Sequence, residues 1–326
     1  MDFFQLEKHG TNVRQEIVAG TTTFLTMAYI IFVNPGILSE TGMDKGALIT
    51  VTCLAALIGT MITALWVNAP LAMAPGMGLN AFFTYTLVFG MGATWNVALG
   101  VVFISGIIFL LLTMTGFREK IIDAIPIQLR LAVGAGIGLF IAFIGMKNLG
   151  LIVANPATLV GLGALSPTVI LGLIGLIIMG GLEIRQIKGG ILIGILITTV
   201  LGMILGYVEL PNSIMSTPPS IAPIAFKLDI LGALKVSMIG PIFSFMFVDL
   251  FDSVGTIVAC ANEAEMIDKD GKIENVSKIL EADAAATVIG SLLGTSTTTT
   301  FVESASGIAQ GGRTGLHLLQ LQYYFF

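Results

Sequence analysis

The sequence predicts an all-α polytopic membrane protein, and three observations lead to this class. The 326 residues are 55% apolar and 11% charged, with a mean hydropathy of +0.96, far outside the range of soluble globular domains. About ten apolar runs have roughly the 17 to 25 residues of a bilayer-spanning helix. Two of these runs are interrupted by residues that disfavour helix. We therefore expect a multi-pass protein of the inner or plasma membrane with two discontinuous spans.

Seven predicted spans precede a polar, proline-bearing loop. The first, 18–33, is expected to end at Asn34-Pro35, because proline breaks a helix. The third is irregular, since prolines and glycines crowd its first half and a continuous helix begins only near Asn80. The other five predicted spans cover residues 46–66, 97–115, 130–146, 168–181 and 189–207.

Spans eight and nine are separated by a charged stretch. Span eight, 236–259, carries Asp249 and Asp252 in its interior. Residues 262–283 are charged and partly amphipathic, so a loop with an interfacial helix is expected there. This leaves a short, partly buried ninth helix at 284–293.

The tenth element, 294–316, is the second discontinuous span. Four consecutive threonines, Thr297 to Thr300, disfavour helix, whereas Glu303 stands where a half-helix can begin. Backbone that leaves its helical hydrogen bonds at membrane depth survives only where protein covers it or where it lines a wet cavity. With an acidic side chain directly after the break, the pattern indicates a transport site.

The distribution of basic residues predicts the orientation of the chain. A cytoplasmic N-terminus places eleven Lys and Arg residues on the cytoplasmic side and four outside, as the positive-inside rule requires. The two broken elements, spans three and ten, lie seven spans apart and therefore run in opposite directions. Paired interrupted segments of this kind are typical of inverted-topology repeats in transporters.

Three acidic residues are the proton-coupling candidates. A carboxylate at the centre of a span costs about 2.5 to 3.5 kcal/mol, so an unpartnered acid such as Asp252 is seldom kept there without a function. Asp249 lies three residues earlier on nearly the same helical face, and two nearby carboxylates disfavour each other's ionisation. Glu303 would lie beside the unpaired N–H groups of a half-helix. The alternatives are helix-packing hydrogen bonds for the two aspartates and helix stabilisation for Glu303.

The same residues predict the kind of ligand. A planar heterocycle could donate its N–H groups to the carboxylates and accept backbone N–H groups with its lone pairs. Asn80 could cap its half-helix or reach the ligand, and Phe301 could stack on an aromatic ring or simply pack. We find no nucleophile set, metal-ligand spacing or phosphate loop. Neither an enzyme with catalytic residues nor a metal or cofactor is therefore expected.

Four segments resemble the azaguanine-permease-like branch of the nucleobase–cation symporters, in the nucleobase:cation symporter-2 superfamily. They are residues 22–35, 74–83, 249–256 and 294–315. The resemblance implies a fourteen-span fold of two inverted seven-span repeats, divided into a core and a gate. It also implies transport of adenine, guanine or hypoxanthine with protons by alternating access.

The resemblance also assigns substrate-binding residues. The family's acids on spans eight and ten, its span-three asparagine, its span-ten aromatic and a polar span-one contact fall on Asp252, Glu303, Asn80, Phe301 and Thr23. The implied partners are a purine nucleobase and the lipid bilayer, with no nucleic acid. The oligomeric state is left open, a homodimer included.

The resemblance ends near Gly315. The family continues with an apolar run and about four more spans, whereas this chain turns to a different tail that resembles a truncation or a shifted reading frame. We expect one transmembrane domain, 1–326, with core spans 1–4 and 8–10, gate spans 5–7 and an incomplete C-terminal part. The alternative functions are a non-transporting fragment and an anion carrier of the same fold.

Overall fold

The computed structural model describes residues 3–115, 127–208, 217–267 and 273–325 and is mostly helical. The helices of the first part are α1 (Val13–Met27), α2 (Ile30–Leu38), η1 (Ser39–Thr41), α3 (Lys45–Ile62), η2 (Thr63–Val67), α4 (Met77–Ala81), η3 (Phe82–Gly90) and α5 (Trp95–Met114). The later helices are α7 (Ile127–Leu149), α8 (Pro167–Ile184), α9 (Gly190–Ile204), α10 (Ile230–Ala233), η4 (Val236–Met238), α11 (Ile239–Glu263), α12 (Val276–Leu293), α13 (Ser304–Ile308) and α14 (Leu316–Phe325). The strands are β1 (Met73–Pro75), β2 (Ile152–Asn155), β3 (Leu159–Leu162) and β4 (Thr298–Thr300).

Several helices match the spans expected of a membrane protein. Among the described residues, five helical stretches are long and apolar enough to cross a bilayer, and shorter apolar helices accompany them. The five are Val13–Thr41, Lys45–Val67, Trp95–Met114, Pro167–Ile184 and Val236–Glu263. The predicted spans at 97–115, 168–181 and 189–207 correspond within a few residues to α5, α8 and α9.

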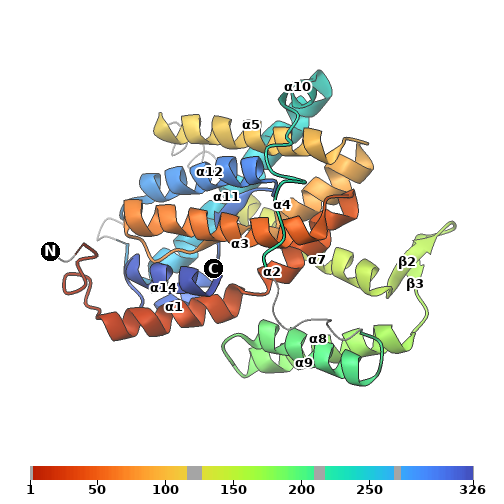
Figure 1. Ribbon diagram of the computed structural model, residues 1–326, viewed down its shortest axis with the longest axis horizontal. Helices are drawn as coiled ribbons and strands as arrows, with labels where there is room; N and C mark the ends of the chain where they lie inside the picture. The colour runs from red at the N-terminus through yellow and green to blue at the C-terminus, as the bar shows by residue number, and fades with distance from the viewer. Residues whose placement is uncertain (1–2, 116–126, 209–216, 268–272, 326) are drawn as a thin grey trace.

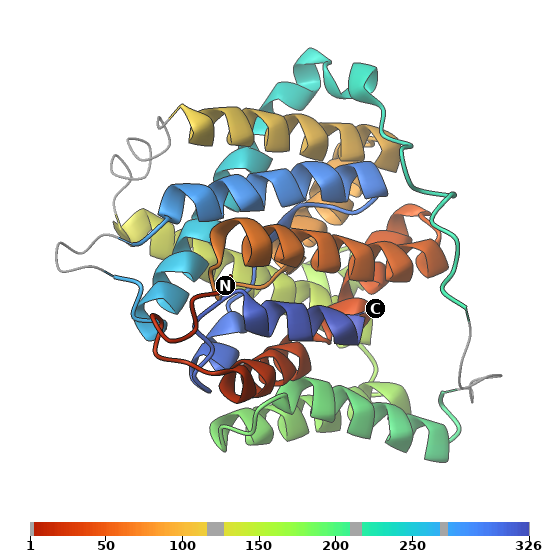
Figure 2. The same ribbon diagram turned by 60° about the vertical axis from the view of Figure 1, so that its left-hand side comes forward.

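The long helices pack into one layered body. Helix α12 lies between α5 and α3, and α14 packs on both α1 and α3 (Figures 1 and 2). The α8–α9 hairpin lies to one side and meets the rest through α1 and α7. Gly106 lets α5 and α12 approach closely, because a Cβ there would lie 3.0 Å from the Val288 side chain.

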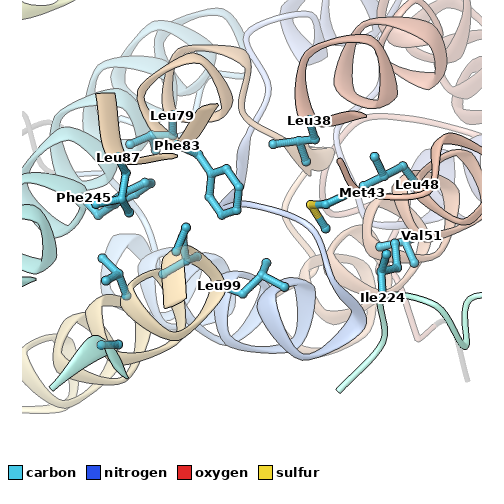
Figure 3. Close-up of a cluster of buried hydrophobic side chains, with 14 of the residues drawn as sticks. Leu38, Met43, Leu48, Val51, Leu79, Phe83, Leu87, Leu99, Ile224 and Phe245 are labelled. Carbon is cyan, nitrogen blue, oxygen red and sulfur yellow. The ribbon is translucent and has the colours of Figure 1, made fainter. Parts of the chain in front are cut away.

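Apolar side chains from distant segments fill the space between these helices. Leu38, Leu48, Phe83, Leu99 and Phe245 come from different elements and meet in one fully buried cluster (Figure 3). In water, burying a side chain of this size contributes roughly 1.5 to 3 kcal/mol. This cluster packs one side of the half-helix that follows β1.

Two short strands meet side by side at the centre of the molecule, and we call this pair the strand crossing. β1 and β4 pair antiparallel, with Met73 opposite Thr300 and Pro75 opposite Thr298. Each strand is followed by a helix, α4 with η3 after β1 and α13 after β4. The predicted interruptions at 70–80 and 294–303 are therefore present, and the two extended pieces hydrogen-bond to each other.

The outer edge of each strand is bonded by a neighbouring helix. In α3, the Thr60 hydroxyl donates to the Met73 carbonyl (2.9 Å) and accepts from the Met73 N–H (3.0 Å). In α12, the Thr287 hydroxyl does the same for Thr298, at 2.9 and 3.2 Å. Membrane-depth backbone needs such partners because no water is available in lipid to replace them.

Two helix boundaries differ from the sequence prediction. Pro35 does not end the first span: it lies inside α2, and the chain is distorted at Ala28–Tyr29, one to two turns earlier. Proline removes one helical hydrogen bond and displaces the carbonyl four residues before it. Where packing holds the residues on both sides, the helix bends at the proline and does not end there. The ninth helix begins at Val276 rather than at residue 284. Its charged first half belongs to the helix because Asp283 finds buried partners there.

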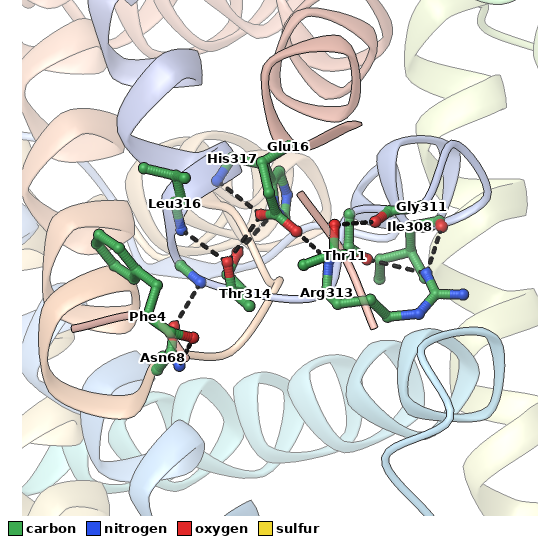
Figure 4. A network of polar contacts seen from close by, with 12 residues as sticks. Phe4, Thr11, Glu16, Asn68, Ile308, Gly311, Arg313, Thr314, Leu316 and His317 are labelled. Carbon is green, nitrogen blue, oxygen red and sulfur yellow. Dashed lines mark hydrogen bonds and ion pairs between the residues drawn. The ribbon is translucent and has the colours of Figure 1, made fainter. Parts of the chain in front are cut away.

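A buried network joins the two ends of the described chain. The Glu16 carboxylate is fully buried and accepts hydrogen bonds from the Arg313 N–H (2.9 Å), the Thr314 hydroxyl (2.8 Å) and the His317 N–H (3.1 Å). Figure 4 shows these contacts converging on the start of α1. Helix α1 is therefore anchored to the loop before α14.

Candidate functional site

A cavity of about 130 Å³ lies beside the strand crossing. Its walls come from the α1–α2 junction, the β1–α4 turn, one face of α11, and β4 with the residues that follow it. The lining includes Tyr29, Gly76, Asp252, Thr256, Phe301 and Glu303. The two discontinuous elements and α11 thus share one hollow.

Two acids from separate elements face this cavity. Asp252, on α11, makes no hydrogen bond to the described residues, and Glu303, directly after β4, accepts one from the Tyr29 hydroxyl. The two carboxylates interact electrostatically with each other, and Asp252 also interacts with Asp283. No basic side chain is among the cavity's described lining residues. The cavity therefore offers hydrogen-bond acceptors without a positive charge to balance them.

Phe301 lies in the same wall, but the predicted residues Asn80 and Thr23 do not line the cavity. Asn80 is fully buried and donates to the Asn34 Oδ1 (2.7 Å), within the packing between α2 and α4. Thr23 faces α13, where a Cβ on Gly307 would come within 2.0 Å of its hydroxyl.

The two aspartates of α11 have different neighbours. Asp249 is 2% exposed and lies 3.5 Å from the hydroxyl of Thr287 in α12. Asp252 reaches the cavity instead. Residues three apart point in similar but not identical directions from a helix, so the two side chains contact different partners.

Sequence reasoning missed another buried acid, Asp283. Its Oδ1 accepts from the Thr300 N–H (2.8 Å) and the Thr300 hydroxyl (3.1 Å), while Oδ2 accepts from Ser253 (2.6 Å). It ends the charged stretch that was expected to lie outside the membrane. The available signal was its position four residues before Thr287, which places both on one helix face.

Tyr29 was also missed. It lies at the α1–α2 junction, 4% exposed, and lines the cavity. A tyrosine in an apolar run gives no signal by itself, because Tyr is common in such runs as a packing residue. Its hydroxyl reaches Glu303 from the turn that separates α1 and α2.

Comparison with known proteins places the chain in a family. A family model described as "Permease family" matches residues 14–317. The adenine permease AdeP of Escherichia coli (strain K12) is 46% identical over 314 residues, covering 96% of this chain and 70% of that protein. The guanine/hypoxanthine permease PbuG of Bacillus subtilis (strain 168) is 47% identical over 325 residues, covering 96% and 74%.

A solved structure supports the fold independently. The transmembrane domain of the cyanobacterial bicarbonate transporter BicA superposes with a TM-score of 0.68 at 18% identity, covering 96% of this chain and 80% of that one. At this identity the likeness concerns the fold alone. Together, the family model, the permease relatives and the apolar helices identify the chain as a multi-pass membrane protein that belongs to the permease family of nucleobase:cation symporters.

Proposed function

We propose that the protein takes up purine nucleobases, namely hypoxanthine, guanine or adenine, by proton symport. The observation that carries the proposal is the convergence of Asp252 and Glu303 on one small cavity beside Phe301. The names of the permease relatives support the substrate class.

The chemistry of the cavity fits a small planar ring that carries N–H groups. Pockets for drug-sized ligands typically measure about 300 to 1,000 Å³, so a cavity of about 130 Å³ suits a much smaller molecule. Two carboxylates can accept the ring and amino N–H groups of a purine. Phe301 offers an aromatic surface on which the ring can stack.

The acids also supply a route by which proton movement can be coupled to substrate transport. A ligand held between carboxylates is bound best when one of them carries a proton, because two adjacent negative charges repel each other. Asp252 and Glu303 would exchange this proton, with Asp249 as a further candidate on α11. Uptake that is abolished by a protonophore, and unchanged when choline replaces sodium, is the expected result.

The proposed architecture is two inverted seven-span repeats, with the core moving against the gate. The matched bonding of Thr60 to β1 and of Thr287 to β4 supports a repeat that relates spans two and three to spans nine and ten. We place the N-terminus in the cytoplasm, from the distribution of Lys and Arg. In this fourteen-span design, spans 1–4 and 8–10 would belong to the core and spans 5–7 to the gate.

An anion carrier of the same fold is the second candidate, because a bicarbonate transporter shares the fold. The cavity argues against it. Asp252 and Glu303 would repel an inorganic anion, and no described lining residue is basic.

Uptake of radiolabelled hypoxanthine, guanine and adenine by cells that express the protein tests the proposal. Asp252→Asn and Glu303→Gln should each reduce uptake roughly 10- to 100-fold, because hydrogen bonds to charged groups contribute about 1.5 to 3 kcal/mol. Glu183→Gln, at an exposed acid near the end of α8, is the matched control and should leave uptake unchanged. Unchanged uptake in both cavity variants, at equal protein levels, would remove the proposed mechanism.

A further inference from the structure

Tyr29 brings a side-chain hydrogen-bond donor to one of the two cavity carboxylates. Its hydroxyl donates to the Glu303 Oε1, and its side chain lines the cavity. At 4% exposure the ring is fixed by packing, whereas the hydroxyl proton can rotate about the C–O bond.

The position of Tyr29 is set by both discontinuous elements. Helix α1, before the junction, packs closely on α13, where Gly307 fits against Ala19 and Thr23. Helix α2, after the junction, is bonded to α4 through Asn34 and Asn80 (2.7 Å). Tyr29 therefore stands where these two attachments meet, and its hydroxyl is held at the edge of the cavity.

The hydroxyl adds a capability that the carboxylates lack. An ionised carboxylate only accepts hydrogen bonds, whereas a phenol can also donate. Purines carry N–H donors directly beside acceptors: in adenine, the 6-amino group lies beside N1 and N7, and N9–H lies beside N3. In guanine and hypoxanthine, N1–H lies beside O6. A carboxylate next to a hydroxyl donor complements each of these edges.

We propose that Tyr29 contacts the substrate directly: Glu303 accepts a purine N–H, and the Tyr29 hydroxyl turns to donate to the adjacent acceptor. This inference rests on the proposed function and deepens it. In the empty cavity the hydroxyl satisfies Glu303; in the loaded cavity the ligand N–H takes its place. One pair can then recognise adenine, guanine and hypoxanthine alike.

Equilibrium binding to the purified protein tests this inference with Tyr29→Phe, which removes only the hydroxyl. Its affinity for adenine should fall roughly 5- to 50-fold, since the ring acceptor is left without a partner. The KM of uptake should rise by a similar factor, while the melting temperature and the maximal rate stay close to wild type. Tyr85→Phe is the matched control, because it removes a Tyr–Glu hydrogen bond of 2.7 Å to Glu40 outside the cavity.

Adenine analogues identify the acceptor atom and keep the test decisive if Tyr29→Phe folds poorly. In 1-, 3- and 7-deazaadenine, one ring nitrogen is replaced by C–H. The wild type should lose affinity for one of the three by about the factor that Tyr29→Phe loses for adenine. Tyr29→Phe should lose nothing further with that analogue. A wild type that binds all three as tightly as adenine, or equal losses in wild type and variant, would overturn the inference.

Failure of this inference differs from failure of the proposed function. If Glu303→Gln abolishes adenine binding and Tyr29→Phe does not weaken it, the purine site stands and the role of Tyr29 is wrong. If Glu303→Gln and Asp252→Asn also leave binding unchanged, the purine site itself is wrong.

Discussion

The outer edges of β1 and β4 both carry backbone groups that need hydrogen-bond partners, and different side chains supply those partners on the two strands. β1 is held at its outer edge by a neutral side chain, Thr60 of α3. β4 is held by Thr287 and by the acid Asp283, both from α12. The difference is a charged group: a carboxylate bonds the edge of β4, whereas the edge of β1 is bonded by a neutral hydroxyl.

Simple geometry explains how one helix can bond alternate residues of a strand. Residues four apart on a helix are separated by about 6 Å along its axis, and residues two apart on a strand by about 6.6 Å. Asp283 and Thr287 therefore reach Thr300 and Thr298 together. A threonine and an acid at this spacing are a sequence signal that can be sought in other broken spans.

Removing the Asp283 carboxylate should have the largest effect on the stability of the protein. Asp283→Ala leaves the Thr300 N–H without its acceptor and also frees the hydroxyls of Thr300 and Ser253. Each buried unsatisfied group costs roughly 1 to 3 kcal/mol, so we expect little folded protein by size-exclusion chromatography in detergent. Asp283→Asn, which keeps an acceptor for Thr300, should fold. Wild-type yield and melting temperature for Asp283→Ala would contradict the role assigned to this side chain.

Thr60 and Thr287 test directly whether the bonds at the outer edges of β1 and β4 contribute equally to stability. Thr60→Val and Thr287→Val keep the side-chain shape and remove one hydroxyl that bonds both groups of a strand residue. Each should lower the unfolding free energy by roughly 1 to 3 kcal/mol, measured as similar falls in melting temperature. Thr→Ser at either position should restore most of the loss. A large loss at one position only would mean that the two edges are not equivalent.

Ser253 should give the smallest effect. Its hydroxyl donates to the Asp283 Oδ2 (2.6 Å) and contacts the Thr299 hydroxyl (2.9 Å). Asp283 keeps both Thr300 donors when Ser253 is replaced, so Ser253→Ala should cost about 0.5 to 1.5 kcal/mol. Comparing the melting temperatures of Ser253→Ala and Asp283→Ala would distinguish the contributions of the two side chains. Equal losses would show that Ser253, rather than Thr300, is the main partner of the acid.

The sequence predicts those features of the fold that depend on local composition. Apolar runs locate the helices, and the proline-rich and threonine-rich breaks locate the crossing strands. Asp252 and Glu303 are predicted as a site because a charge inside an apolar run is costly. Pro35 is misread because its effect depends on whether the neighbouring helices support the kink. Asp283 and Tyr29 are missed because their roles arise only from partners that are distant in the chain.

The Glu16 network has a consequence for synthesis of the protein. The backbone and hydroxyl groups that bond this carboxylate, from Arg313 to His317, are made about 300 residues later than Glu16 itself. At 5 to 20 residues per second, the ribosome needs about 15 to 60 s to supply them. Until then, the start of the first span must keep its charge in water or at the translocon. That span can therefore settle into its final place only after residues 313–317 have been made.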